Sequence, residues 1–211
     1  LFNLRRMLMN KSFIIKIILL CLVTIKVSAI EKVILFGDSL MAGYGLPKEQ
    51  HLSVVLQNSL SLEGHNIKII NGSVSGSTSA GGLNIVEWTL SENNIDLMIL
   101  CLGANDMLRG IQPSETEQNL ESIIKIAQSK KIEIILAGML APTSYGIEYK
   151  KNFDQIYSNL SKKYDLKFIP FLLEGVAFNP SLNLSDGMHP NSKGTIVISN
   201  TLKKSILNYI N

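Results

Sequence analysis

Five short runs of aliphatic and β-branched residues predict β-strands. They cover residues 33–36, 67–70, 97–102, 132–137 and 167–171. Most of these runs are apolar at consecutive positions, which is typical of strands buried on both faces of a sheet. Between and after the runs, apolar residues recur at helical spacing, over about 49–63, 80–93, 114–130 and 148–164 and again after residue 190.

The alternation of strand and helix predicts the fold class. Repeated strand–helix–strand units form a parallel sheet with helices on both faces and right-handed crossovers. We therefore expect an α/β fold, a three-layer α/β/α sandwich around a five-stranded parallel sheet. In such sheets the functional site lies at the carboxyl ends of the strands. Candidate site residues should therefore follow residues 36, 70, 102, 137 and 171.

Ser39 follows the first predicted strand, within the motif Gly37-Asp38-Ser39-Leu40. A serine at a turn from strand to helix is exposed, and its own backbone N–H can help to hold a developing oxyanion. A purely structural role as a helix N-cap residue remains open for Ser39, because Asp and Ser are favoured at that position.

His189 is the best candidate for a general base among the three histidines of the chain. His51 and His65 flank a predicted surface helix, and we expect them to be solvated. His189 follows Asp186 by three residues in a loop before the last helix. This spacing allows Asp186 to bind one ring nitrogen while the other faces Ser39. Asp186 is also a typical turn residue, and the two roles are compatible.

Two further strand ends supply candidate hydrogen-bond donors for an oxyanion. They are the Gly76 amide, in a loop of small residues that we expect to enter a helix, and the Asn105 side chain in Gly103-Ala104-Asn105-Asp106. Loss of one such donor typically costs about 3 kcal/mol of transition-state stabilisation. Alternatively, Asn105 or Asp106 caps the next segment, and Gly76 only permits a positive φ angle.

Taken in chain order, these motifs resemble the four motif blocks of the SGNH (GDSL) hydrolases. The resemblance covers nearly the whole chain after residue 29, and it implies the flavodoxin-like SGNH fold with no metal and no cofactor. It also implies roles for five residues, with Ser39 as nucleophile, His189 as general base and Asp186 as its orienting carboxylate. The Ser39 and Gly76 amides and the Asn105 side chain would form the oxyanion hole.

Within that superfamily, the chain looks most like the periplasmic branch of multifunctional thioesterases, lysophospholipases and arylesterases. The likeness continues past the third block through Met107-Leu108-Arg109-Gly110, Gln112-Pro113 and Thr116-Glu117-Gln118. Residues 140–146 look like the loop that borders the acyl pocket in this branch, which implies substrate contacts from Pro142 and Tyr145. The expected reaction is hydrolysis of acyl esters and thioesters.

Residues 1–29 have the composition of a secretory signal peptide. They contain five basic residues and no acidic ones, and an apolar run leads to Val27-Ser28-Ala29. We expect cleavage after Ala29, a domain over 30–211 and a periplasmic or secreted protein. An uncleaved anchor is the alternative, although the apolar run is shorter than the ~20 residues that a spanning helix needs. The whole chain carries a formal charge of +3, whereas residues 30–211 carry −2.

Several other classes of function lack support in the sequence. Basic residues do not cluster with aromatic ones after residue 29, which argues against nucleic-acid binding. Cys101 lies in an apolar run where a thiol is normally inert, and His189 has no second histidine or cysteine near it at metal-ligand spacing. We expect a monomer that acts on small acyl esters or thioesters and touches membrane lipid transiently. A carbohydrate deacetylase, an acyltransferase and a non-catalytic lipid-binding protein remain alternatives.

Overall fold

A five-stranded parallel sheet forms the centre of the molecule, as the sequence predicts. The computed structural model describes residues 30–91 and 94–210, so the predicted signal peptide lies outside the described residues. The strand order is β2-β1-β3-β4-β5, with every neighbouring pair parallel. The strands are β1 (Lys32–Gly37), β2 (Lys68–Asn71), β3 (Leu97–Cys101), β4 (Glu133–Ala137) and β5 (Lys167–Ile169).

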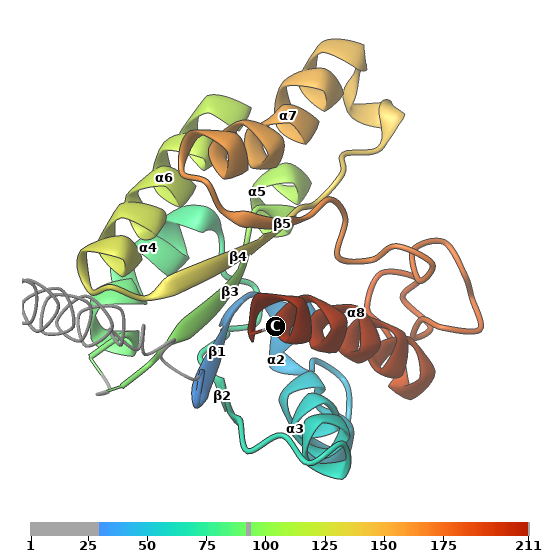
Figure 1. Ribbon diagram of the computed structural model, residues 1–211. Coiled ribbons are helices and arrows are strands. Elements are labelled where there is room, and N and C mark those ends of the chain that lie inside the picture. Colours follow the sequence, from blue (N-terminus) through green and yellow to red (C-terminus); the bar gives the residue numbers. More distant parts are fainter. Residues whose placement is uncertain (1–29, 92–93, 211) are drawn as a thin grey trace, which may run out of the picture.

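Helices cover both faces of this sheet, which gives the expected three layers (Figure 1). One face carries α4 (Ser79–Thr89), α6 (Pro113–Ser129) and α7 (Ile147–Lys163), which pack in that succession. The other carries α3 (Leu52–Leu62) and α8 (Ser192–Ile210), which pack against each other. Four short elements complete the fold, namely helices α2 (Ser39–Ala42) and α5 (Ala104–Leu108) and the 3-10 turns η1 (Lys48–Gln50) and η2 (Thr143–Tyr145).

The inner strands confirm the prediction of burial on both faces, whereas the edge strands do not. All five residues of β3 are buried, as are the last five of β1 and the last four of β4. The edge strand β2 has no buried residue, and β5 has one. An edge strand has a neighbour on one side only, and the helices above and below it cover it less completely.

The predicted helix over 49–63 is wrong at its start. The chain forms the turn η1 first, and His51 then adopts an extended conformation as the N-cap residue of α3. His51 is also not solvated as expected. It is half-buried, its Nε2 lies 3.1 Å from the Leu46 carbonyl oxygen, and its ring packs against Gly43. These local contacts replace the first helical turn.

A long segment between β5 and α8, residues 170–191, carries the predicted base and its carboxylate (Figure 1). Buried Asn183 donates to the carbonyls of Val176 and Asn179 at 2.7 and 2.8 Å. Asn191 then accepts from the amides of Lys193 and Gly194, in the manner of an N-cap residue for α8. The segment is thus an ordered extension of the core.

Gly194 allows α8 to approach this segment closely. A Cβ atom built there would lie 2.2 Å from the Leu182 carbonyl oxygen, a backbone atom that cannot rotate away. We therefore expect Gly194→Ala to lower the free energy of unfolding by on the order of 1–3 kcal/mol, despite the ~1 kcal/mol that alanine normally gains in a helix. Urea titration measures the change. Lys204→Ala, on the exposed side of the same helix, serves as the control, and equal stability of both variants would contradict the argument.

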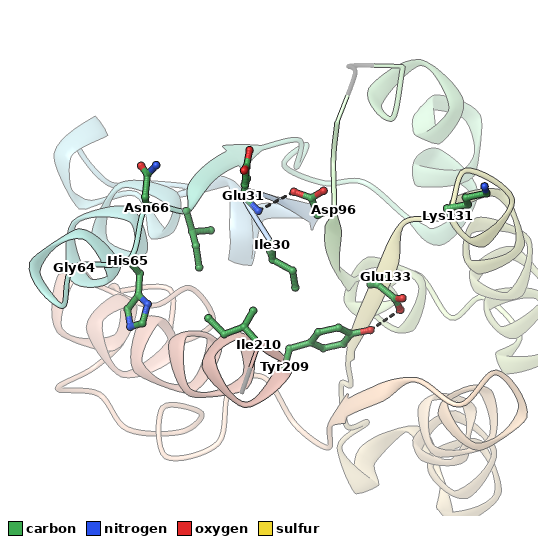
Figure 2. A pocket seen from close by; sticks show the side chains of 11 residues that line it. Ile30, Glu31, Gly64, His65, Asn66, Asp96, Lys131, Glu133, Tyr209 and Ile210 are labelled. Carbon is green, nitrogen blue, oxygen red and sulfur yellow. Dashed lines mark hydrogen bonds between the residues drawn. The ribbon is translucent and has the colours of Figure 1, made fainter. Parts of the chain in front are cut away.

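The amino edge of the sheet contains a cavity of about 780 Å³ (Figure 2). Ile30 lines it beside Tyr209 and Ile210 near the end of α8, and Tyr209 donates a hydrogen bond to Glu133. This cavity and Ser39 lie at opposite edges of the sheet, because Ser39 follows the carboxyl end of β1. Among residues 30–91 and 94–210, no helix has the length and apolar character needed to cross a membrane.

Candidate active site

Ser39 occupies the first position of the short helix α2, directly after β1. The N-cap role considered for Ser39 is wrong, because Asp38 is the N-cap residue and its Oδ1 accepts from the Leu40 amide at 3.0 Å. The Ser39 amide is one of the first-turn N–H groups that a helix leaves without an intrahelical partner. Ser39 is half-buried at the carboxyl edge of the sheet, and its N–H has no acceptor among the described residues.

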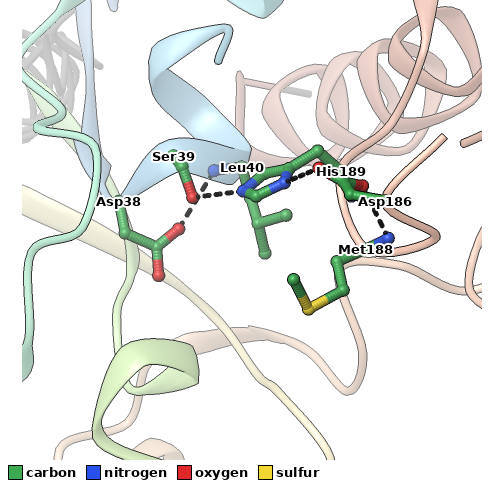
Figure 3. A network of polar contacts seen from close by, with 6 residues as sticks. All are labelled: Asp38, Ser39, Leu40, Asp186, Met188 and His189. Atoms are coloured by element: carbon green, nitrogen blue, oxygen red, sulfur yellow. Dashed lines mark hydrogen bonds and ion pairs between the residues drawn. The ribbon is translucent and has the colours of Figure 1, made fainter. Parts of the chain in front are cut away.

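The structure brings Ser39, His189 and Asp186 together (Figure 3). Ser39 Oγ lies 2.9 Å from His189 Nε2, although 150 residues separate them in the chain. On the other side of the ring, His189 Nδ1 lies 2.7 Å from Asp186 Oδ2. A carboxylate only accepts hydrogen bonds, so it holds the proton on Nδ1 and leaves Nε2 free to accept from the serine hydroxyl.

Asp186 also shapes the loop that carries the histidine. Its Oδ1 accepts from the backbone amides of Met188 and His189 at 2.9 and 3.0 Å. These two bonds, with the ring of His189, lower the pKa of Asp186 to about 2. Asp186 is therefore ionised throughout the physiological range. The turn-forming role and the ring-binding role proposed from the sequence coexist, each on its own oxygen.

Tyr44 covers one face of the His189 ring, a contact that the sequence interpretation missed. The two ring centroids are 4.4 Å apart, with an angle of 38° between the planes. Tyr44 follows α2 and is itself about half exposed. Its only sequence signal is its place five residues after Ser39, which does not reveal a contact with a residue at the far end of the chain.

Asn105 lies in α5 and points its amide nitrogen toward Asp38. Its Nδ2 donates to Asp38 Oδ2 at 3.2 Å. Asp38 is only 1% exposed, and burial raises its pKa to about 6, against the opposing effect of the hydrogen bonds from the Leu40 amide and from Asn105. The sequence interpretation treated Asp38 only as part of a motif, whereas the structure shows a buried carboxylate that links β1 to α5.

Gly76 lies in the loop before α4, and a side chain from another segment, Arg109, binds its backbone. It has a φ angle of +78°, so the permissive role considered from the sequence applies. Its carbonyl oxygen accepts from the Arg109 guanidinium at 2.9 Å. Among the described residues, the Gly76 amide has no hydrogen-bond acceptor. This N–H is therefore available to a ligand.

Buried Asp106 of α5 hydrogen-bonds to Ser79, at the end of the same loop. It is fully buried, and its carboxylate accepts from both the backbone amide and the hydroxyl of Ser79 at the start of α4. Thr116 Oγ1 adds a third bond at 3.2 Å. Asp106 thus binds the start of the preceding helix α4, whose N-cap residue is Thr78, and does not cap the next segment as the alternative from the sequence proposed. Asn105 is directed toward Asp38.

Pro142 and Tyr145 lie after β4, in the loop that forms η2. Pro142 is the N-cap residue of η2, and the Tyr145 ring stacks on Tyr149 of α7 at a centroid distance of 5.5 Å. Tyr149 in turn stacks on Phe153, and Phe153 meets Tyr157 edge to face. No described hydrogen bond or ring contact joins Pro142 or Tyr145 to the serine, so their substrate contacts stay a prediction.

Cys101 does not take part in this arrangement. It ends β3 with 1% exposure, and burial raises the pKa of its thiol well above the ordinary value. A buried thiol of raised pKa is a poor nucleophile at neutral pH. This environment agrees with the inert role expected from its apolar surroundings.

Comparison with known proteins finds a family and several relatives. Residues 35–195 match the GDSL-like lipase/acylhydrolase family. Esterase TesA of Pseudomonas aeruginosa is 35% identical, over 77% of this chain and 81% of the relative. Thioesterase 1/protease 1/lysophospholipase L1 of Escherichia coli is 31% identical over 91% of each chain.

A solved structure agrees with this assignment. The crystal structure of the psychrotrophic esterase EstA from Pseudoalteromonas sp., inhibited by monoethylphosphonate, superposes with a TM-score of 0.82. It is 30% identical in sequence, and the match covers 86% of this chain and 99% of that chain. The fold, the family match and the relatives therefore agree, and the chain belongs to the GDSL-like lipase/acylhydrolase family of ester hydrolases.

Proposed function

We propose that the protein hydrolyses acyl esters and thioesters through an acyl-enzyme on Ser39. The observation that carries this proposal is the continuous chain of hydrogen bonds from Ser39 Oγ through the His189 ring to Asp186, at 2.9 and 2.7 Å. Such a chain activates a serine hydroxyl whose own pKa is far too high for it to ionise at neutral pH.

The geometry supports a reaction in two halves. Ser39 Oγ attacks the carbonyl carbon of the substrate while its proton moves to His189 Nε2. The tetrahedral intermediate then collapses, and the alcohol or thiol leaves with that proton. In the second half, a water molecule gives a proton to Nε2 and attacks the acyl-enzyme. The acyl–Oγ bond then breaks, the acid leaves, and Nε2 returns the proton to Ser39 Oγ. Asp186 stays ionised throughout and stabilises the imidazolium.

Three N–H groups from three strand ends would hold the oxyanion. They are the backbone amides of Ser39 and Gly76 and the second N–H of the Asn105 amide, whose first N–H is bound to Asp38. These three donors lie on separate loops, so their relative positions must be held by contacts between the loops. Arg109 and Asp106 make such contacts, because both connect the α5 segment to the Gly76 loop.

Asn105→Ala tests the side-chain donor. We expect kcat to fall by about 10²- to 10³-fold with KM nearly unchanged, because the bond to the oxyanion strengthens only in the transition state. Steady-state kinetics on a chromogenic acyl ester measures both constants. An effect confined to KM would assign Asn105 to ground-state binding instead.

The substrate class rests on the relatives. They are named as an esterase and as a thioesterase and lysophospholipase, and an arylesterase of Vibrio mimicus is 32% identical over 86% of this chain. We therefore propose arylesters, lysophospholipids and acyl-CoA thioesters as substrates, with Pro142 and Tyr145 beside the acyl chain. These substrates are small molecules, and we propose that a monomer acts on them without a cofactor.

A substrate series tests this proposal directly. Residues 30–211 are assayed with chromogenic esters of increasing chain length, palmitoyl-CoA, lysophosphatidylcholine and acetylated sugars, each beside the Ser39→Ala variant. We expect hydrolysis of several acyl esters, lost in the variant. Activity on acetylated sugars alone would favour a carbohydrate deacetylase, and no activity would favour a binding protein. Mass spectrometry after phosphonate treatment should locate the label on Ser39.

We also propose that residues 1–29 are removed during export, which leaves a periplasmic or secreted domain over 30–211. The basic residues and the apolar run of that segment support the proposal. Expression of the full chain with Edman sequencing of the product tests it. We expect a mature protein that begins at Ile30, whereas an intact leader in the membrane fraction would show that the segment is an anchor.

A further inference from the structure

The buried carboxylate of Asp38 lies close to the proposed oxyanion hole, which poses an electrostatic problem. A negative charge there opposes the negative charge that develops on the substrate. Both of its oxygens are in use, since Oδ1 accepts from the Leu40 amide at 3.0 Å and Oδ2 accepts from Asn105 Nδ2 at 3.2 Å. The cap on α2 needs only the first of these bonds, so the second calls for its own explanation.

The bond from Asn105 to Asp38 can be explained by the two chemically different ends of the Asn105 amide. A primary amide has an NH₂ group that donates and a carbonyl oxygen that accepts, and the two ends are nearly equal in size. Rotation by 180° about the last bond would exchange them and place an acceptor beside the oxyanion. An ionised carboxylate can only accept, so it binds the NH₂ end. One N–H is then bound to Asp38, and the second remains for the substrate.

We propose that ionised Asp38 is a positioning residue that selects the amide orientation in which Asn105 donates to the oxyanion. This inference rests on the proposed function and adds the group that prepares one of its three donors. It also accounts for a buried charge next to the reaction centre. The repulsion between Asp38 and the oxyanion is unfavourable, but it is offset because the Asn105 N–H is already oriented before the substrate binds.

The surroundings of Asp38 allow its ionised form at neutral pH. The titratable groups that act on it are His189 from the loop before α8, Asp106 from α5, Cys101 at the end of β3 and Tyr157 from α7. Burial raises the pKa of Asp38 to about 6. One pH unit above that value, about 90% of the carboxyl groups are ionised. Below it, a protonated Asp38 can donate to the Asn105 oxygen and favour the reversed amide.

Asp38→Asn replaces the acceptor Oδ2, which binds Asn105, by an NH₂ donor and keeps the shape of the side chain. The Leu40 amide requires an acceptor, so the new side chain places its oxygen there and its NH₂ group toward Asn105. Asn105 must then turn its own oxygen to that NH₂ group. We expect kcat to fall by about 10- to 100-fold with KM within about threefold of the wild type, since one oxyanion donor is lost.

A double-mutant cycle shows whether Asp38 acts through Asn105. We expect the variant with both Asp38→Asn and Asn105→Ala to have a kcat within about threefold of Asn105→Ala alone, because the amide that Asp38 orients is absent. Asp96→Asn is the matched control. Asp96 also accepts two backbone amides, those of Glu31 and Lys32 at 2.8 Å, but at the amino edge of the sheet. We expect its kcat to stay within twofold of the wild type.

Losses that multiply in the double variant would overturn the inference, since Asp38 would then act through His189 or through the fold. If Asp38→Asn does not fold, the pH dependence of kcat/KM decides in its place. The ratio of kcat/KM in the wild type to kcat/KM in Asn105→Ala cancels the contribution of groups that both proteins share. Below pH 6, we expect this ratio to fall by about tenfold or more, because Asp38 gains a proton and no longer selects the donating amide. A ratio that does not change with pH would overturn the inference.

These outcomes are separate from failure of the proposed function. Full activity of Ser39→Ala would remove the acyl-enzyme mechanism itself. An inactive Ser39→Ala beside additive Asp38 and Asn105 effects would leave the mechanism in place and remove only the positioning role.

Discussion

Ser39→Ala should abolish ester hydrolysis while the protein stays folded. Replacement of the nucleophile in a serine triad lowers kcat by on the order of 10⁴- to 10⁶-fold. The described hydrogen bond of the Ser39 hydroxyl is the one to His189 Nε2 at 2.9 Å, so its removal costs the fold little. Hydrolysis of a chromogenic acyl ester measures the loss of activity, and a thermal melt within a few degrees of the wild type shows that the fold is retained.

Ser122→Ala provides the matched control for this result. Ser122 lies on α6, where its hydroxyl donates to the Gln118 carbonyl in an exposed position and contacts no residue of the proposed site by a described hydrogen bond. We expect wild-type kinetics from this variant. Substantial activity in Ser39→Ala would show that another group attacks the ester, and the assignment of the nucleophile would be wrong.

Asp186→Asn should lower kcat by on the order of 10⁴-fold through the tautomer of His189. The Met188 and His189 amides require an acceptor, so they bind the amide oxygen of the new side chain. Its NH₂ group then faces Nδ1, which must become an acceptor. The proton consequently moves to Nε2, where it blocks the transfer from Ser39. Steady-state kinetics near pH 7 measures the effect.

Comparison with Asp186→Ala separates the tautomer effect from the loop effect. Alanine removes the acceptor for both backbone amides, so we expect a lower melting temperature than for Asp186→Asn. The order of the two variants in activity should differ from their order in stability, because alanine leaves His189 free to adopt either tautomer. We expect Asp186→Asn to be the more stable variant but no more active than Asp186→Ala. Retention of a tenth or more of wild-type kcat in Asp186→Asn would contradict the orienting role.

The sequence was sufficient to predict the architecture and the residues that converge at one edge of the sheet. Apolar runs mark all five strands to within two residues, because inner strands of a parallel sheet require consecutive apolar positions. The rule that strand ends meet at one edge predicted that Ser39 and Asn105 lie near one another. The choice of His189 came instead from comparison of the three histidines and from its spacing to Asp186. In the structure, Ser39 Oγ lies 2.9 Å from His189 Nε2.

The contacts that support these residues could not be predicted in the same way. Asp38 pairs with Asn105, Arg109 binds the Gly76 carbonyl, and Tyr44 covers His189, each across more than thirty residues of chain. Such pairs have no periodicity and no fixed spacing, so one sequence does not reveal them. The error at residues 49–51 has a local cause, since helical spacing does not show that a histidine ring binds a preceding carbonyl.

The position of Ile30 and Ile210 relative to Ser39 matters for any use of the protein on a surface. Both residues line one cavity at the amino edge of the sheet (Figure 2), whereas Ser39 follows the carboxyl end of β1 at the opposite edge. A bead, a fusion domain or a cell-surface display module joined ahead of Ile30 would therefore hold the protein with the proposed nucleophile facing outward. Immobilised enzyme should keep access to bulky, lipid-like substrates without a long spacer.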